Sequence, residues 1–574
     1  MAKALQIGGG NFAELVQGDY LFVDKTALFI SAVLTDPSKA VVITRPRRWG
    51  KSLNMSMLHH FLAPEVNGVA TQGMFDGLAI SKISGNYIEK HQGQSPVIFL
   101  SFKDFKASSF ELALSLFEGL IKEMFRTHEN LLNHTEKTWS QSEEALFTHY
   151  LRDALSEADM ASALKALSSL LYKAYGKKAY ILIDEYDTPL NHAFVGNDCF
   201  ESLSLLMRKF LSGGMKDNSF VDKGVMTGIL RVSKDSMLSG LNNCETYTPL
   251  NDKRYHASFG FLQEDLIALF ADQGLSHDEP KVQDWYNGYC INGLTLYNPW
   301  SIMNCLSHQG EIRPYWVLTS DDQLLKELIQ SSSEELKDNL EQLVLGQSVE
   351  VQVSETMRFD QIHENEDMLW NLLLLGGYLK ALSSHHNEWG YACLVAVPNQ
   401  EVLWSYRSIF AHWMKQVPKG MGYRKSLLDS LMSGDIDRFA AETQAFLESA
   451  ASVHDYATQP EAFYHGFMLA LIATLQDQFF VFSNSESGRG RPDMILIPKD
   501  QSKDTALILE FKHAQKKEKA KKIAEQALKQ IEVQQYAARI SQYDHIQKIL
   551  GVGIAFEGKK VMVASGLIIP GNEA

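Results

Sequence analysis

Gly50, Lys51 and Ser52 are the residues in the first third of the chain that are best suited to phosphate chemistry. They follow the apolar run 40–43 after a short polar stretch and lead into a helical pattern. A strand that turns into a helix in this way aims backbone N–H groups at one point, where Lys51 would bind phosphate oxygens and Ser52 would bind Mg²⁺. The usual motif starts with a glycine, but Arg45 occupies that position. The sequence therefore predicts a nucleotide-phosphate site with an unusual first residue.

A second group of polar residues ends the apolar run 179–183. Asp184 and Glu185 follow that run directly, which is typical of a strand that ends beside a phosphate loop. There Asp184 can hold Mg²⁺ through water, and Glu185 can orient or deprotonate the attacking water. The alternative is that both acids only end the strand and begin a turn, which is the role we expect for Asp187. We assign Asp184 to nucleotide and metal binding and Glu185 to catalysis.

Several arginines could meet the phosphates as well. Arg231 follows the apolar run 225–230, and a polar side chain at the tip of a neighbouring strand can reach the γ-phosphate. Arg45, Arg47 and Arg48 could contact phosphates or an acidic surface, and the alternative is a solvated loop. We place Arg45, Arg48 and Arg231 among the residues that bind the nucleotide.

A second site is predicted in the last quarter of the chain. The runs 493–497 and 506–512 flank a polar turn, which indicates a β-hairpin. If the hairpin is symmetric about its turn, Asp493 lies opposite Glu510, and Lys512 shares a face with Glu510. Carboxylates suit Mg²⁺ or Mn²⁺, and Lys512 could position or activate a water molecule. An exposed ion pair between Glu510 and Lys512 is the alternative.

The lysines that follow this hairpin leave two interpretations open. The stretch 512–522 is rich in lysine and could line a groove for a nucleic-acid backbone. It could equally be the solvated start of a helix.

Five segments of the first half, in this order and spacing, resemble the family of bacterial AAA-ATPase-like proteins that usually carry a C-terminal PD-(D/E)xK nuclease domain. They are 23–26, 45–52, 181–187, 227–234 and 241–243. In that family an arginine commonly replaces the first glycine of the phosphate loop. The resemblance implies that Glu461 is a further metal ligand, that 488–493 is the motif before the catalytic Asp493, and that Gln526, Gln530 and Tyr536 belong to the same site.

The elements that must position these residues suggest an α/β fold in three parts. We predict a P-loop NTPase domain with a parallel sheet at 1–258, a mainly helical connector at 259–440, and an α/β PD-(D/E)xK nuclease-like domain at 441–574. A chain of 574 residues is too long for one hydrophobic core, since a domain usually holds roughly 150 residues. In the connector we expect a helix, a small hairpin and a return to helices, with the aromatic clusters near 285–300 packed in its core.

Composition narrows the class of protein. The net charge of -15 excludes a uniformly basic protein that coats nucleic acid, although local basic grooves are compatible with it. Five well-separated cysteines without a Cys-x-x-Cys pair fit a reducing compartment. We find neither a signal peptide nor a run long enough to span a bilayer, so we expect a cytoplasmic protein without a membrane partner.

The predicted function is ATP binding and hydrolysis coupled to metal-dependent cleavage of nucleic acid. The expected cofactors are ATP and Mg²⁺, with Mn²⁺ as an alternative at the nuclease site, and the expected partner is nucleic acid, with DNA favoured over RNA. Homo-oligomerisation is compatible with the sequence. One alternative is a nucleotide-dependent switch or scaffold whose nuclease-like domain binds nucleic acid or protein without cutting. Another is a motor that moves along nucleic acid.

Overall fold

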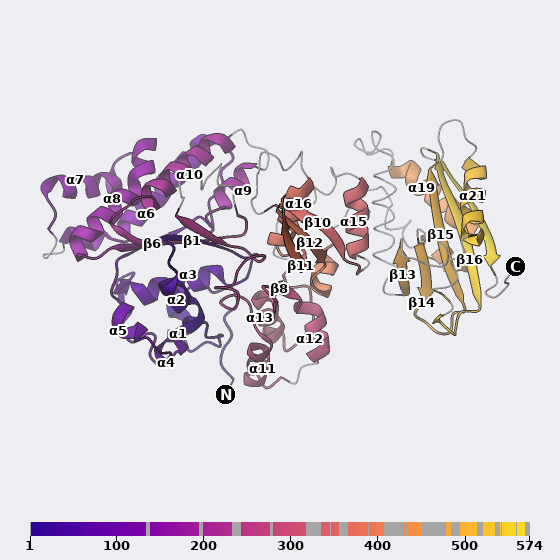
Figure 1. Cartoon of the computed structure of the whole chain (residues 1–574), viewed down its shortest axis with the longest axis horizontal. Helices are drawn as coiled ribbons and strands as arrows, with labels where there is room; N and C mark the ends of the chain where they lie inside the picture. The colour runs from indigo at the N-terminus through magenta and orange to yellow at the C-terminus, as the bar shows by residue number, and fades with distance from the viewer. Residues whose placement is uncertain are drawn as a thin grey trace. The chain divides into compact units, whose positions relative to one another are not determined.

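In the computed structural model the chain forms two compact units, which we treat separately (Figure 1). The first unit contains residues 1–324 and 350–402, and the second contains 325–349 and 403–574. These limits do not coincide with the boundaries expected at 258 and 440, and the three-domain division stays a prediction. The residues that the structure describes are 2–133, 138–194, 199–231, 243–275, 279–316, 334–344, 346–354, 366–388, 390–406, 426–427, 429–431, 433–450, 478–483, 494–513, 520–533, 540, 542–557 and 560–568.

A five-stranded parallel sheet forms the centre of the first unit. Every residue of β1 is buried, as expected for a strand covered on both faces, where continuous apolar runs replace alternation. β6 lies between β1 and β5, so the phosphate loop and the acidic strand end are separated by one strand. The strands in spatial order are β4 (Val97–Ser101), β5 (Ala179–Asp184), β6 (Val221–Gly228), β1 (Ala40–Thr44) and β7 (Cys244–Tyr247).

Helices cover both faces of this sheet. α3 (Lys51–Leu62) lies on one side, and α6 (Phe110–Arg126), α8 (Glu157–Tyr175) and α10 (Phe200–Met215) lie on the other (Figure 1). The parallel sheet with helices confirms the α/β fold predicted for this part of the chain. The remaining described elements here are α1 (Phe12–Gln17), α2 (Thr26–Thr35), β2 (Glu65–Val66), β3 (Val69–Ala70), α4 (Ala79–Lys82), α5 (Tyr87–His91), η1 (Glu129–Asn133), α7 (Gln141–Arg152) and α9 (Thr188–Phe194).

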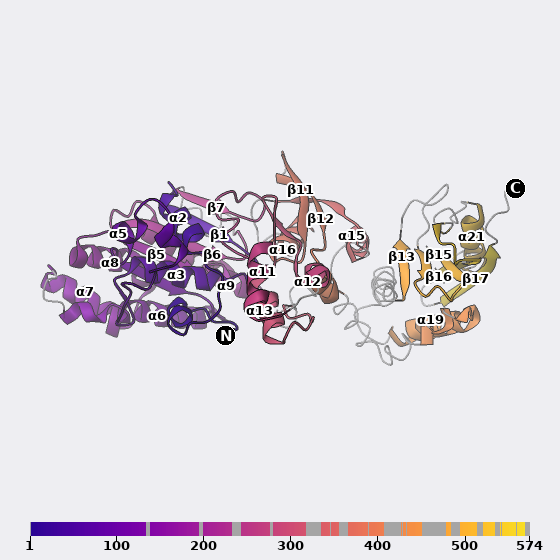
Figure 2. The ribbon, with the colours of Figure 1, turned by 90° about the horizontal axis from the view of Figure 1, so that it is seen from below.

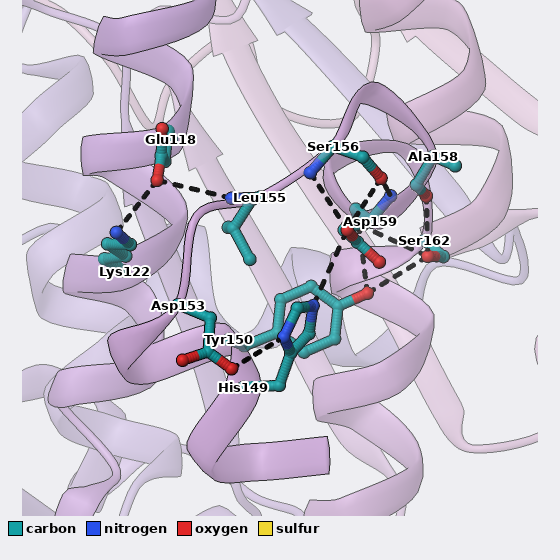
Figure 3. Close-up of polar contacts among 10 residues, drawn as sticks. All are labelled: Glu118, Lys122, His149, Tyr150, Asp153, Leu155, Ser156, Ala158, Asp159 and Ser162. Atoms are coloured by element: carbon teal, nitrogen blue, oxygen red, sulfur yellow. Dashed lines mark hydrogen bonds and ion pairs between the residues drawn. The ribbon is translucent and has the colours of Figure 1, made fainter.

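Polar side chains fasten α7 to α8 on the outer helical layer (Figure 3). The hydroxyl of Ser156 accepts a hydrogen bond from the N–H of Asp159, and the Asp159 carboxylate accepts one from the N–H of Ser156. This reciprocal cap satisfies N–H groups that the first turn of α8 leaves free. His149 on α7 lies between Asp153 at 3.0 Å and Asp159 at 3.5 Å, and these carboxylates raise its pKa.

The chain after β7 continues within the first unit as helices and short hairpins. Tyr286, Tyr297 and Ile302 are fully buried in one apolar cluster, as expected for the aromatic segments. Asn298 caps α13 by accepting hydrogen bonds from the N–H groups of Trp300 and Ser301. The elements are α11 (Gln263–Asp272), α12 (Glu279–Tyr286), β8 (Tyr289–Ile291), β9 (Leu294–Leu296) and α13 (Pro299–Ser307).

Beyond this point the connector contains more strand than the sequence suggested. The expected helix and hairpin are present as α16 (Glu366–Leu375) followed by β11 (Lys380–Asn387) and β12 (Gly390–Ala396), and residues 400–406 return to helix. A third strand, β10 (Val349–Val353), completes a sheet of order β10-β12-β11. The prediction missed β10 because its alternating pattern is short.

The second unit contains a five-stranded mixed sheet, with α19 (Ile436–Ala450) and α21 (Ala520–Val533) on opposite faces (Figure 2). A Cβ added to Gly553 would lie 2.3 Å from the carbonyl oxygen of Ala524, so only glycine lets α21 approach the sheet this closely. The strands in spatial order are β13 (Phe479–Ser483), β14 (Met494–Pro498), β15 (Thr505–His513), β16 (Lys548–Glu557) and β17 (Lys560–Ile568), and α15 (Glu334–Val344) also falls in this unit.

Two further observations bear on the expectations from composition. All five cysteines lie among the described residues and are free thiols. Within the described segments, no helix combines the length and the apolar character needed to cross a bilayer.

Candidate functional site

The phosphate loop joins β1 to α3 where the sequence predicted it. Gly50 adopts φ +77° at the N-cap of α3, a conformation that favours glycine. Apart from its chain neighbours and the backbone of α3, no atom of the described residues lies within 4 Å of the position where a side chain would begin. The ammonium group of Lys51 donates hydrogen bonds to the carbonyl oxygens of Arg45 at 3.1 Å and Pro46 at 2.9 Å. The lysine is thus folded back across its own loop, beside open space at a helix N-terminus. This arrangement fits a bound phosphate group.

Three carboxylates interact electrostatically with the buried ammonium group of Lys51. Burial lowers the pKa of Lys51, and the carboxylates of Glu185, Asp184 and Asp187 oppose that change. Burial in turn raises the pKa of Glu185, which the lysine counteracts. Lys51 and the carboxylates at the end of β5 therefore interact electrostatically, although β6 lies between β5 and the strand that leads to Lys51. The geometry brings Lys51, Asp184 and Glu185 together, as the sequence implied.

Asp184 is held by a residue that the sequence reasoning did not select. Thr227 on β6 donates a hydrogen bond from Oγ1 to Oδ1 of Asp184 at 2.6 Å. Both side chains are buried, with 0% and 2% of their surface exposed. Thr227 pairs directly with Ile43 of β1, so it stands between the acidic strand end and the strand that delivers the phosphate loop.

Glu185 and Asp187 take different roles after the strand. Glu185 adopts φ +55°, which is uncommon for a residue with a side chain and marks the sharp turn out of β5. Asp187 is buried and accepts hydrogen bonds from the N–H groups of Ile229 at 3.0 Å and Leu230 at 2.8 Å. Asp187 directly precedes α9, and its hydrogen bonds hold the backbone that follows β6. This position agrees with the role in a turn that we expected for it.

Arg45 makes contacts that differ from the phosphate contact expected for it. Its side chain is completely buried, forms an ion pair with Asp252, and lies over the ring of Phe259 at 5.1 Å. Its guanidinium also donates to the carbonyl oxygen of Thr44 at 2.7 Å. In the place of the usual glycine, this arginine therefore anchors the base of the loop.

The other residues of the loop also contact the chain that follows β7. The guanidinium of Arg48 lies 4.2 Å from the ring of Trp300, and the carbonyl oxygen of Arg47 accepts a hydrogen bond from Nε1 of Trp316. Trp49 is buried and packs edge-on against Tyr289. Arg231 follows β6 by three residues and is partly buried. The nucleotide contacts predicted for Arg48 and Arg231 stay predictions.

In the second unit, the expected hairpin has the expected register. Met494 pairs with Leu509, Ile495 with Ile508, and Leu496 with Leu507, which is the pairing that a turn symmetric about residues 501 and 502 requires. The register is confirmed for these three pairs. The next pair in the series would be Asp493 with Glu510, but Asp493 lies outside the described residues, as do Glu461, the rest of 488–493 and Tyr536. Their assigned roles stay predictions.

Glu510 is a buried carboxylate in contact with two polar side chains. Glu510 follows three apolar residues of β15, and only 3% of its surface is exposed although it is a carboxylate. Gln530 of α21 donates a hydrogen bond to Oε1 of Glu510, and Nζ of Lys512 lies 3.9 Å from the same oxygen. Lys512 is about a third exposed at 35%, so the pair is not a simple solvated ion pair. Gln526 is exposed on the same helix.

Comparison with known families agrees with both parts of this description. Residues 6–238 match a family described as predicted AAA-ATPase, and residues 459–566 match the PD-(D/E)XK nuclease superfamily. The chain therefore contains an AAA-ATPase-like region at 6–238 and a region similar to the PD-(D/E)XK nuclease superfamily at 459–566. The ATPase-like region contains Lys51, Asp184, Glu185 and Thr227, and the nuclease-superfamily region contains Glu510 and Lys512.

Two individual proteins show similarity to this chain. A protein of Azotobacter chroococcum, described as an uncharacterized protein in the vnfD 5′ region, is 28% identical over 328 residues, covering 57% of this chain and 56% of that protein. The chain thus spans about half the length of this relative. A Walker-type ATPase of Pyrococcus abyssi aligns with a TM-score of 0.35 and 13% identity over 67% of this chain and 96% of that one.

Two residues of the first unit were given no role from the sequence. Thr227 begins segment 227–234 of the family resemblance, but a threonine within an apolar strand gave no reason to assign it a role of its own. Asp252 is 207 positions from Arg45, so no local pattern joins them. A buried arginine without a nearby acid could have prompted a search for such a partner.

Proposed function

We propose that the ATPase-like region binds and hydrolyses ATP with Mg²⁺. The observation that carries this proposal is the position of Lys51, whose ammonium group crosses its own loop and interacts electrostatically with Asp184 and Glu185. Lys51 and the N–H groups at the start of α3 would bind the β- and γ-phosphates, and Ser52 with Asp184 would hold Mg²⁺. The metal ion would offset the negative charge of the phosphates.

Within this proposal, Glu185 is the residue that orients or deprotonates the attacking water. Burial raises its pKa, which brings a carboxyl group closer to the range of a useful general base. Arg48 and Arg231 are assigned to nucleotide phosphates, and we assign Arg45 to anchoring the loop. The buried pair of Arg45 with Asp252 supports that reassignment.

We further propose that the nuclease-superfamily region cleaves phosphodiester bonds in nucleic acid with Mg²⁺ or Mn²⁺. The support is the burial of Glu510 beside Lys512 and Gln530, since a carboxylate shielded from water and contacted by polar groups is suited to a divalent cation. Asp493 and Glu461 are the further ligands in this proposal. Lys512 would position the attacking water and offset the charge of the scissile phosphate.

The proposal also places the protein in the cytoplasm, which the five free thiols support. DNA is the favoured substrate over RNA, nucleotide state controls cleavage, and self-association is compatible with these roles.

Two activities measured on the full chain test the proposal. Wild-type protein should release phosphate from Mg-ATP, and Lys51→Ala should abolish release while Lys103→Ala, at an exposed lysine, leaves it unchanged. With Mg²⁺ or Mn²⁺ and ATP, wild-type protein should cut DNA or RNA, and Glu510→Gln should not, whereas the exposed Glu525→Gln should. ATP hydrolysis without cleavage of any substrate would instead favour a nucleotide-dependent switch or scaffold.

A further inference from the structure

Arg48 of the phosphate loop, whose side chain we assign to nucleotide phosphate, contacts the ring of Trp300. Its guanidinium lies 4.2 Å from the ring of Trp300, which belongs to α13, and its backbone adopts φ +67°. Such a φ is uncommon for a residue with a side chain, so the backbone of Arg48 is held in a less favourable conformation. A phosphate group offers a guanidinium paired, charge-assisted hydrogen bonds that are stronger than contact with a ring. Bound nucleotide would therefore compete with Trp300 for Arg48.

A buried hydrogen-bond network begins at the residue next to Trp300. Ser301 donates from Oγ to Oε2 of Glu401 at 2.7 Å, and Oε1 of Glu401 accepts the N–H of Trp316 at 2.7 Å. Nε1 of Trp316 then donates to the carbonyl oxygen of Arg47 at 3.1 Å. The network therefore begins at Ser301, next to Trp300, and ends at the carbonyl oxygen of Arg47. The carboxylate of Glu401 thus connects the ring that contacts Arg48 with the backbone of Arg47.

Burial makes this network responsive to movement of the loop. Ser301 and Glu401 are 0% exposed and Trp316 is 1% exposed, so little water is available to replace a lost contact. In such surroundings an unpaired polar group is costly, and a shift of one member must be matched by the others. Glu401 belongs to the helical residues 400–406, and the second segment of the second compact unit begins within them, at residue 403.

We propose that exchange of Arg48 between Trp300 and a nucleotide phosphate is the step that reports ATP occupancy, and that Ser301, Glu401 and Trp316 transmit it to residues 400–406. This inference rests on the proposed binding of ATP and adds a route by which the ATP site affects residues 400–406. The two states of Arg48 supply the alternative arrangements that coupling requires. Trp300, Ser301, Glu401 and Trp316 act as positioning residues and make no contact with the reacting atoms.

Hydrogen exchange on the full chain tests the inference directly. Amide exchange of the peptide covering 400–406 is measured with and without saturating Mg-ATP, after ATP affinity has been determined for each variant. In wild-type protein ATP should change the exchange rate by roughly threefold or more. Trp300→Leu removes the ring and Ser301→Ala removes the first hydrogen bond, so both should bind ATP while losing most of that response. Glu401→Gln is the matched control, because its amide can still accept from Trp316 and donate to Ser301.

Each outcome decides between the inference and the function on which it rests. If wild-type protein binds no ATP, the proposed function fails and the inference falls with it. If wild-type protein binds ATP but exchange at 400–406 is unchanged, the inference is overturned while ATP binding stands. A full wild-type response in Ser301→Ala also overturns it, and this conservative variant decides the matter if Trp300→Leu does not fold.

Discussion

Thr227 and Asp184 are joined across two neighbouring strands by a buried hydrogen bond, with Oγ1 of the threonine 2.6 Å from Oδ1 of the aspartate. The bond uses one of the two carboxylate oxygens and fixes the orientation of the other. Loss of a group that orients a metal-binding carboxylate commonly lowers metal affinity or activity by about 10- to 100-fold. Thr227 is therefore a positioning residue of the proposed ATPase site.

Replacing Thr227 by valine should lower ATP turnover by roughly 10- to 100-fold. Valine keeps the shape of the side chain but cannot donate to Asp184, so the carboxylate loses its orientation while Lys51 still binds phosphate. Steady-state phosphate release and ATP affinity should be measured together, with affinity changing by about threefold or less. Thr227→Ser retains the hydroxyl and serves as the control. A valine variant that is less stable but turns over normally per folded molecule would show that the bond is only structural.

Asp252→Asn should destabilise the first unit by about 3–5 kcal/mol, because it leaves the guanidinium of Arg45 buried without a charged partner. Oδ1 of Asp252 accepts hydrogen bonds from the N–H groups of Arg254 and Tyr255, and the asparagine can still accept them. Urea unfolding of the variant and of wild-type protein provides the measurement. The double variant Arg45→Met with Asp252→Asn should recover much of the loss, because it removes the unpaired guanidinium and keeps the acceptor for these N–H groups.

The same double variant separates the two roles considered for Arg45. If Arg45 only anchors the loop, the folded double variant should bind ATP within about tenfold of wild-type affinity. If Arg45 contacts phosphate, as its position in the motif suggested, the loss of affinity should exceed that of a single charge-assisted hydrogen bond, about 1.5–3 kcal/mol.

Local sequence patterns were sufficient to place the phosphate loop, the acidic end of β5 and the register of the β14–β15 hairpin. Each depends on residues close together in the chain: Gly50 and Lys51 at a strand-to-helix turn, and three pairs around one tight turn. The pair of Arg45 with Asp252 spans 207 positions and that of Ser301 with Glu401 spans 100, and only the packed fold brings such residues together. For Arg45, the motif position suggested a phosphate contact, whereas its buried ion pair with the distant Asp252 supports a role in anchoring the loop.

Glu401 should make the stability of the first unit fall as the pH rises from about 5 to 8. Burial is the largest cause that raises the pKa of Glu401 from 4.5 to about 7, so the folded protein binds a proton that the unfolded chain has already lost. The stabilising effect of that proton is complete below the unfolded pKa and is lost as the pH passes through the folded pKa. The difference corresponds to roughly 3 kcal/mol.

Glu401→Gln removes this titration without changing the size of the side chain. Urea unfolding at pH 5.5 and pH 8 should show wild-type protein losing stability relative to the variant at the higher pH. The raised pKa of His149 also makes the protein more stable at low pH. Both proteins contain His149, so its contribution cancels when wild-type protein is compared with Glu401→Gln. Equal pH dependence in the two proteins would show that Glu401 is ionised throughout.

Gln530 should matter to metal binding in the nuclease-superfamily region because it holds Glu510. Its amide donates to Oε1 of Glu510, and Gly553 allows α21 to lie close enough for this contact. Gln530→Leu should weaken Mn²⁺ binding, measured by calorimetry, by roughly 10- to 100-fold and reduce any cleavage in parallel. Glu525→Leu, an exposed change on the same helix, is the control. If Mn²⁺ affinity is the same in both variants, the hydrogen bond serves packing alone; if Glu510→Gln also leaves Mn²⁺ affinity unchanged, Glu510 is not a metal ligand.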